Sequence, residues 1–144
     1  MASFFCEHTD LDWLGVRHNT NKSSRWKNAS GEIIKKNSLL DRYEFFLRQK
    51  KNLSPLSLLE LGAGPNENIG ASLRCWKDYF TDKDDIHVAD IKETATVLKE
   101  EGFHVHIGDL GSIDFLRKLA QKKWDFILDD ASHQLRTPLS VLRT

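Results

Sequence analysis

The sequence predicts an α/β fold in which a parallel sheet of about four strands follows a helical N-terminal extension. Four short apolar segments of strand length alternate with segments whose apolar residues have helical spacing. Strands that alternate with helices form βαβ units and a parallel sheet. The 144 residues are enough for one domain. We expect residues 1–52 to form the loop and helix extension and residues 53–144 to form the sheet domain.

The composition is that of an ordinary soluble protein. Hydrophobic residues make up 40% and charged residues 29%, with 21 basic and 21 acidic side chains. Balanced charge gives no general attraction to nucleic acid or to an anionic membrane, and no apolar segment approaches the roughly 20 residues that span a bilayer. Two distant cysteines, Cys6 and Cys75, favour a reduced, cytoplasmic setting. We therefore expect a small-molecule partner, without nucleic acid or membrane.

The N-terminal third contains one predicted helix. Residues 15–31 are polar and basic and predict a loop. Ser38 is a suitable N-cap for a helix that runs to about Gln49. Its apolar face is formed by Leu39, Leu40, Tyr43, Phe46 and Leu47. Residues 50–55 form a linker.

The remaining elements alternate regularly. Strands are predicted at residues 56–61, 86–91, 103–107 and 124–128, and helices at residues 69–80, 93–101 and 113–121. Gly102 ends the second of these helices. Thr137 as N-cap and Pro138 at the first helical position predict a further helix.

Polar residues follow each predicted strand at its carboxyl end, where parallel α/β sheets bind ligands. They are Gly62 to Gly64, Asp90, Asp109 and Asp129 to His133. Glycines allow a ligand to approach the backbone closely, but the same residues suit a plain strand-to-helix turn. The spacing of a G-x-G-x-x-G dinucleotide motif fails, because Gly70 comes too late.

The acidic residues have two interpretations each. Asp90 can accept hydrogen bonds from both hydroxyls of a ribose, or it can be a solvated strand end or a helix cap. Asp109 can accept from the exocyclic amine of an adenine, or it can cap the next helix. Asp129, Asp130 and His133 suit a divalent metal or a general base, or a helix cap beside a surface histidine. A metal site needs more ligands than this cluster offers.

These residues resemble a known family. The stretch Leu59 to Gly64, followed by Gly70-Ala71-Ser72-Leu73-Arg74-Cys75-Trp76, resembles motif I of class I S-adenosylmethionine-dependent methyltransferases. Within that class it is similar to the branch of macrolide-sugar O-methyltransferases and cephalosporin hydroxylase-like proteins. Asp129 to His133 resembles the D-D-G-S-H motif of that branch, and Asn19 to Ser24 resembles its G-x-D-K-S-S-like loop. The resemblance covers roughly residues 11–137.

The resemblance implies a Rossmann-like methyltransferase sheet, S-adenosylmethionine as cofactor and Mg²⁺ as a second cofactor. Glu60, Gly62 and Gly64 would lie beside the methionine part of the cofactor, with Asp129 in the same site. Asp90 would bind the ribose and Asp109 the adenine. Asp130 would be a magnesium ligand. His133 would be the catalytic base that removes a proton from a substrate hydroxyl.

The sequence departs from the family pattern at several positions. Pro65 lies in a longer first loop, Asn21 stands where an aspartate is usual, and Ala131 replaces a glycine. The family has a fifth strand with two further acidic ligands, and this sequence ends at Thr144 before one. We expect a truncated, partial sheet whose fourth strand is an exposed edge, and an apolar edge favours a homodimer.

Three functions remain open on this basis. The first is methyl transfer to a small-molecule or sugar hydroxyl. The second is a truncated, non-catalytic binding or assembly module. The third is a nicotinamide-dependent oxidoreductase, and the failed dinucleotide spacing argues against it.

Overall fold

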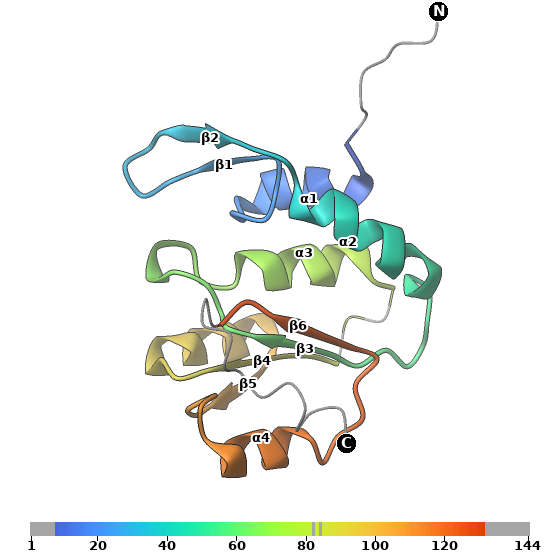
Figure 1. The fold of residues 1–144 in the computed structure, drawn as a ribbon, viewed down its shortest axis with the longest axis vertical. Helices are drawn as coiled ribbons and strands as arrows, with labels where there is room; N and C mark the ends of the chain where they lie inside the picture. The colour runs from blue at the N-terminus through green and yellow to red at the C-terminus, as the bar shows by residue number, and fades with distance from the viewer. Residues whose placement is uncertain (1–7, 82, 84, 132–144) are drawn as a thin grey trace, which may run out of the picture.

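A computed structural model describes residues 8–81, 83 and 85–131. In Figure 1 the N-terminal helices α1 and α2 lie above helix α3, and a four-stranded sheet lies between α3 and α4. The predicted α/β class with a helical N-terminal extension is therefore confirmed. His133, Thr137 and Pro138 lie outside the described residues, as does any helix that begins there.

The N-terminal extension is more ordered than the sequence suggested. Helix α1 (Asp10–His18) begins after Thr9, whose side chain accepts from the Asp12 amide, and ends at Asn19 in the left-handed region. Strands β1 (Arg25–Lys27) and β2 (Ile33–Lys35) pair antiparallel. The prediction of a loop over residues 15–31 was therefore only partly right: residues 19–24 and 28–31 are turns and irregular segments, whereas residues 15–18 belong to α1 and residues 25–27 form β1. Strands of three residues are too short to show alternation of apolar and polar residues, so no pattern in the sequence predicted them.

Helix α2 (Leu39–Leu47) begins at the predicted cap, where Ser38 accepts from the Asp41 amide. A short 3-10 helix, η1 (Arg48–Lys50), continues it. The predicted apolar face was only partly right. Leu40 and Leu47 are buried, whereas Phe46 is 69% exposed.

The parallel sheet has the order β5-β4-β3-β6. Its strands are β3 (Leu58–Leu61), β4 (Ile86–Asp90), β5 (His104–Ile107) and β6 (Phe126–Asp129). Counted from β3 as the first strand, this is the order 3-2-1-4, which the resemblance to class I methyltransferases implies for the first four strands. Among the described residues β6 pairs with β3 alone and forms one edge.

Helical segments connect the strands. They are the 3-10 helix η2 (Asn66–Asn68), α3 (Ala71–Tyr79), the 3-10 helix η3 (Glu93–Glu101) and α4 (Ile113–Leu119). The helix predicted over residues 93–101 thus exists with 3-10 geometry, and Gly102 ends it with a φ of 91°. Gly70 precedes α3 with a φ of 80°, and a Cβ there would lie 2.4 Å from Leu98 Cδ2.

Two hydrophobic clusters hold the layers together. On one face of the sheet Leu58 and Val88 pack with Trp76 of α3, and the same cluster includes Leu11 of α1 and Leu40 of α2. The extension and the sheet domain therefore share one core. On the other face Leu59, Leu61 and Ala89 pack against Leu116 and Leu119 of α4. In the described part of the chain no helix is long and apolar enough to cross a bilayer.

Candidate functional site

The segments that follow the four strands begin at one edge of the sheet. The Gly62 amide donates to the Ala89 carbonyl at 2.8 Å, and the Asp130 amide donates to the Leu61 carbonyl at 2.9 Å. The Gly108 amide donates to the Asp90 carbonyl at 3.0 Å. These bonds continue the pairing between neighbouring strands one residue beyond the strand ends. The polar residues predicted there therefore lie next to one another at the carboxyl edge of the sheet.

The first turn requires its glycines. Gly62 has a φ of 95° and Gly64 a φ of 91°, in the left-handed region that favours glycine. A Cβ at Gly62 would also lie 2.9 Å from the Ala131 Cα. Gly62 therefore lets the segment after β6 pass directly over the turn.

Asp90 is held inside this turn. Asp90 is only 6% exposed to solvent. Oδ2 accepts from the Ala63 amide at 2.8 Å, and Oδ1 accepts from the Lys92 amide at 2.9 Å. The solvated strand-end alternative therefore fails. Each carboxylate oxygen can accept a second hydrogen bond, so the turn does not exhaust Asp90 as an acceptor.

Asp109 is exposed at the end of β5. Its Oδ1 accepts from the Gly111 amide at 2.8 Å. The helix cap is supplied instead by Ser112, whose hydroxyl accepts from the Phe115 amide. Asp109 thus shapes the loop before α4 and does not cap that helix.

The segment after β6 is described as far as Ala131, so His133 cannot be placed. Asp129 and Asp130 are both exposed. Asp129 Oδ1 accepts from the Ala131 amide at 3.2 Å. Asp130 faces the N-terminal extension instead, and one of its oxygens binds Lys22.

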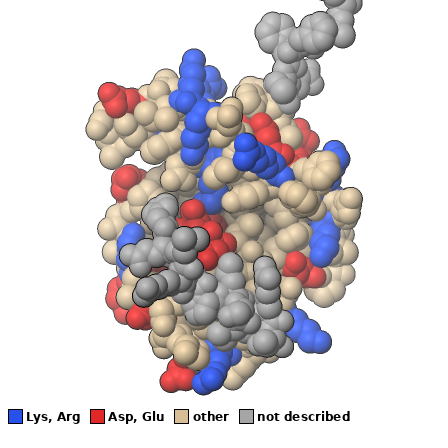
Figure 2. Space-filling model, in the orientation of Figure 1, with Lys and Arg blue, Asp and Glu red and all other residues tan. Residues whose placement is uncertain are grey.

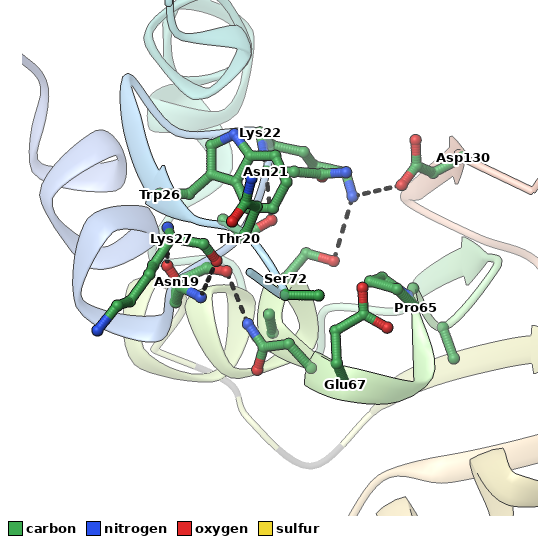
Figure 3. A pocket seen from close by; sticks show the side chains of 16 residues that line it. Asn19, Thr20, Asn21, Lys22, Trp26, Lys27, Pro65, Glu67, Ser72 and Asp130 are labelled. Carbon is green, nitrogen blue, oxygen red and sulfur yellow. Dashed lines mark hydrogen bonds and ion pairs between the residues drawn. The ribbon is translucent and has the colours of Figure 1, made fainter. Parts of the chain in front are cut away.

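A cavity of about 300 Å³ lies between the N-terminal extension and the first turn. Figure 3 shows residues from both sides pointing into it. They are mostly polar: Asn19, Thr20, Asn21, Lys22, Trp26, Lys27, Asn28, Ala29, Ala63, Gly64, Pro65, Glu67, Asn68, Ala71, Ser72 and Asp130. The face shown in Figure 2 carries acidic and basic side chains interspersed.

Lys22 is the buried cation of this cavity, and it is only 4% exposed. Nζ lies 2.6 Å from Asp130 Oδ2, and it donates to Ser72 Oγ at 3.3 Å (Figure 3). It also lies 3.2 Å from Glu60 Oε1. Burial alone lowers the pKa of Lys22, but the two carboxylates outweigh it and hold the pKa above its usual value. Lys22 is therefore charged.

Glu60 is fully buried and faces α3. Oε1 accepts from Ser72 Oγ at 2.7 Å, and Oε2 accepts from Trp76 Nε1 at 2.9 Å. Glu60 reaches the cavity only through Lys22 and Ser72. The family resemblance implied a direct cofactor contact for Glu60. It assigned no role to Lys22, although Lys22 lies in the loop Asn19 to Ser24 that resembles a loop of the family.

Two carboxylates among the described residues line this cavity, those of Glu67 and Asp130. Asp130 Oδ2 is engaged by Lys22. The described groups of three or more ligand-type side chains lie elsewhere, at Asp85, His87 and His104 and at His8, Asp12 and Asp41. A magnesium ion at Asp130 would therefore have few protein ligands among the described residues and would keep several water ligands.

Cys75 takes no part in chemistry at this site. It is fully buried in α3, and its thiol donates to the Ala71 carbonyl. Burial raises the pKa of the thiol to about 12, so the nucleophilic thiolate is not populated near neutral pH.

Solved structures of the MycE methyltransferase from the mycinamycin biosynthetic pathway have the same fold. Its complex with Mg and SAH has a TM-score of 0.74 at 25% sequence identity, over 95% of this chain and 36% of that chain. Its complex with Mg, SAH and mycinamycin VI has a TM-score of 0.73 at 26% identity, over 95% and 34%. A second crystal form with Mg and SAH has a TM-score of 0.72 at 26% identity, over 94% and 33%.

The described fold is thus the Rossmann-like methyltransferase fold that the sequence motifs predicted, and the chain spans about a third of the neighbour's length. The sequence matches no protein-family model and no curated protein. The likeness to MycE, a methyltransferase whose structures hold SAH and Mg, confirms the resemblance drawn from the motifs after β3 and β6.

Proposed function

We propose that this chain is the cofactor-binding part of an S-adenosylmethionine-dependent methyltransferase that acts on a small-molecule hydroxyl. The observation that carries this proposal is the bond from the Ala63 amide to Asp90 Oδ2 at 2.8 Å. It joins the glycine turn after β3 to the acid after β4, the two features that a nucleoside-containing cofactor needs next to each other.

The cofactor would lie along the carboxyl edge of the sheet. Gly64 would leave the backbone open to its methionine part, because a Cβ there would meet no atom closer than 3.8 Å. Gly62, Glu60 and Asp129 would lie beside it. Asp90 would accept from its ribose hydroxyls, using the lone pairs that the turn leaves free. Asp109 is exposed and bound by one amide only, so it can accept from the adenine amine. The MycE structures that contain SAH support this assignment.

The cavity beside Lys22 would receive the methyl acceptor. It is lined by side chains that can donate and accept hydrogen bonds, which suits a hydroxylated substrate. A MycE structure that also contains mycinamycin VI supports a small-molecule acceptor. A bound acceptor would be aligned with the cofactor and shielded from water, which is how positioning accelerates a two-substrate reaction.

His133 would act as the base that removes the hydroxyl proton, and Asp130 would be one magnesium ligand. When bound, magnesium would stabilise the substrate oxygen as it loses that proton. Lys22 would hold Asp130 at the edge of the cavity through its ammonium group. The remaining ligands would be water molecules, Glu67, which lines the same cavity, or residues outside the described ranges.

Calorimetric titration of the full chain with S-adenosylhomocysteine, with and without Mg²⁺, tests the proposal. We expect binding by the wild type and at least a tenfold loss in Asp90→Ala. Asp114→Ala is the matched control, because Asp114 is an 88% exposed residue on α4. Circular dichroism on each variant verifies folding.

The outcomes separate the two functions that the sequence left open. Affinity that increases with Mg²⁺ would support catalysis with Asp130 as a ligand. No binding by a folded wild-type chain would refute the proposed function and favour the non-catalytic assembly module.

A further inference from the structure

Three histidines meet on the face of the sheet that α4 covers, at the amino ends of the strands. His104 and His106 are two residues apart on β5, so both side chains point to one face. His87 on β4 lies directly opposite His104 in the strand register. On the other side, His87 pairs with Leu59 of β3, which packs in the same hydrophobic cluster as Leu116 and Leu119 of α4. This group is therefore separate from the cavity at the carboxyl ends.

A carboxylate completes the group. Asp85 Oδ1 lies 2.6 Å from His87 Nε2, and His87 Nδ1 lies 2.8 Å from His106 Nε2. The rings of His87 and His104 stack with centroids 4.4 Å apart. One ligand atom from each of Asp85, His87 and His104 lies within 4.8 Å of the other two.

We propose that Asp85, His87 and His104 form a binding site for a divalent cation of the zinc class. In a tetrahedral site with bonds of 2.0–2.2 Å, neighbouring ligand atoms are roughly 3.3 Å apart. Side-chain movements of about an ångström would bring the three ligand atoms to that spacing. Two imidazoles and one carboxylate select Zn²⁺ or Co²⁺ over Mg²⁺, which prefers oxygen ligands alone.

The second layer of contacts orients these ligands. Asp85 Oδ2 accepts from the Ser57 hydroxyl and lies 2.8 Å from Lys122 Nζ, which leaves Oδ1 turned toward His87. His106 contacts the other nitrogen of the His87 ring. Ligand histidines and carboxylates in metal sites characteristically have such outer partners, which fix their orientation.

The hydrogen bonds determine which ring nitrogen of His87 carries a proton in the metal-free protein. The carboxylate of Asp85 can only accept, so His87 Nε2 carries the proton of their hydrogen bond, and Nδ1 accepts from His106. A neutral imidazole binds a metal through one nitrogen and carries its proton on the other. On metal binding His87 would therefore move its proton from Nε2 to Nδ1 and donate to His106 Nε2, while His106 would carry its own proton on Nδ1, so no net proton is lost. His104 is exposed, and the Asp85 side chain is 27% exposed. The ion can therefore enter from solvent, and water can supply the fourth ligand.

The test uses the full chain freed of metal, with Zn²⁺ calorimetry and Co²⁺ absorption spectroscopy. We expect one ion per chain and the intense visible absorption of tetrahedral Co²⁺. His104→Ala should abolish binding, and because His104 is at the surface this variant should fold. His106→Ala should weaken binding by about 10- to 100-fold, as loss of an outer partner does.

Two matched controls locate the site. His18→Ala removes a histidine that contacts Asp78 and does not belong to the group of Asp85, His87 and His104. His8→Ala removes the histidine of the second described group, whose Asp12 oxygens already accept from Ser24 and Ser38. Both variants should bind as the wild type does. No ion bound by the folded wild type, unchanged binding in His104→Ala, or loss of binding in His8→Ala would each overturn the proposal.

Magnesium and S-adenosylhomocysteine separate this site from the proposed cofactor site. Excess Mg²⁺ should leave Zn²⁺ binding unchanged, and competition by Mg²⁺ would contradict the ligand set. S-adenosylhomocysteine binding should be the same in His104→Ala and the wild type. Failure of either proposal therefore leaves the other standing.

Discussion

Lys22 Nζ lies 2.6 Å from Asp130 Oδ2, so a side chain from the N-terminal extension holds the loop that follows the last described strand. The same ammonium lies 3.2 Å from the fully buried Glu60. One lysine thus connects three segments that are far apart in the sequence. It also determines where Asp130 stands at the cavity.

Lys22→Met should lower the free energy of unfolding by about 3–5 kcal/mol. It leaves the buried charge of Glu60 uncompensated, and breaking one side of a buried ion pair costs about that much. The double variant Lys22→Met/Glu60→Gln should recover part of the loss. Urea unfolding measures both, and a double variant that is less stable than Lys22→Met would contradict the expected coupling.

Gly62→Ala should destabilise the chain more than Gly31→Ala does. Both glycines have positive φ, 95° and 85°, so both substitutions carry a similar backbone penalty of about 1 kcal/mol. Only at Gly62 would the new Cβ meet backbone, 2.9 Å from the Ala131 Cα, whereas at Gly31 the nearest atom is Lys27 Cε at 3.8 Å. The difference between the two in thermal unfolding measures the close approach of the loop after β6, and equal losses would argue against it.

Asp109→Ala should weaken S-adenosylhomocysteine binding several-fold and leave stability within about 0.5 kcal/mol of the wild type. The side chain is exposed and accepts one amide bond, from Gly111. Calorimetry and thermal unfolding of the same sample separate the two effects. Unchanged affinity would limit Asp109 to its role in the loop.

Glu101→Gln should reduce stability at neutral pH and have no effect in acid. Two bonds of 2.7 and 2.8 Å from Arg74 hold the pKa of Glu101 below its usual 4.5. A lowered folded-state pKa contributes stability above pH 4.5 and loses it as pH falls through the folded value. Because Glu101 is 39% exposed, the effect at neutral pH should be below about 1 kcal/mol.

The check on this pair is a pH series of urea unfolding, with the exposed neighbour Glu100→Gln as the control. The control should differ little from the wild type at every pH. A Glu101→Gln deficit that persists at low pH would show that charge is not its cause.

Local sequence patterns were enough to predict most of the sheet domain. The strands predicted at residues 56–61 and 86–91 are observed at Leu58–Leu61 and Ile86–Asp90, and the glycine turn and the helix stop at Gly102 lie where they were predicted. Each depends on neighbours in the sequence: an apolar run, a positive φ or a polar strand end. The motifs after β3 and β6 also indicated the methyltransferase fold.

The N-terminal extension was harder to predict because its order comes from distant residues. Asp12 accepts from Ser24 and Ser38, which ties α1 to the loop and to the cap of α2. Hydrogen bonds between residues so far apart in the sequence leave no periodic pattern in residues 15–31 from which they could be predicted. The loop predicted there was therefore right only for residues 19–24 and 28–31, and the hairpin β1–β2 was missed.

The sequence by itself determined the alternation of strands and helices and which acids stand at the strand ends, since both follow from local residue chemistry. Only the tertiary structure decided what those side chains do. It buried Glu60 against Trp76, turned Asp90 to the Ala63 amide and brought Lys22 to Asp130 across 108 residues of sequence. Contacts at that separation depend on how the layers pack, and packing is a property of the whole chain rather than of any local pattern.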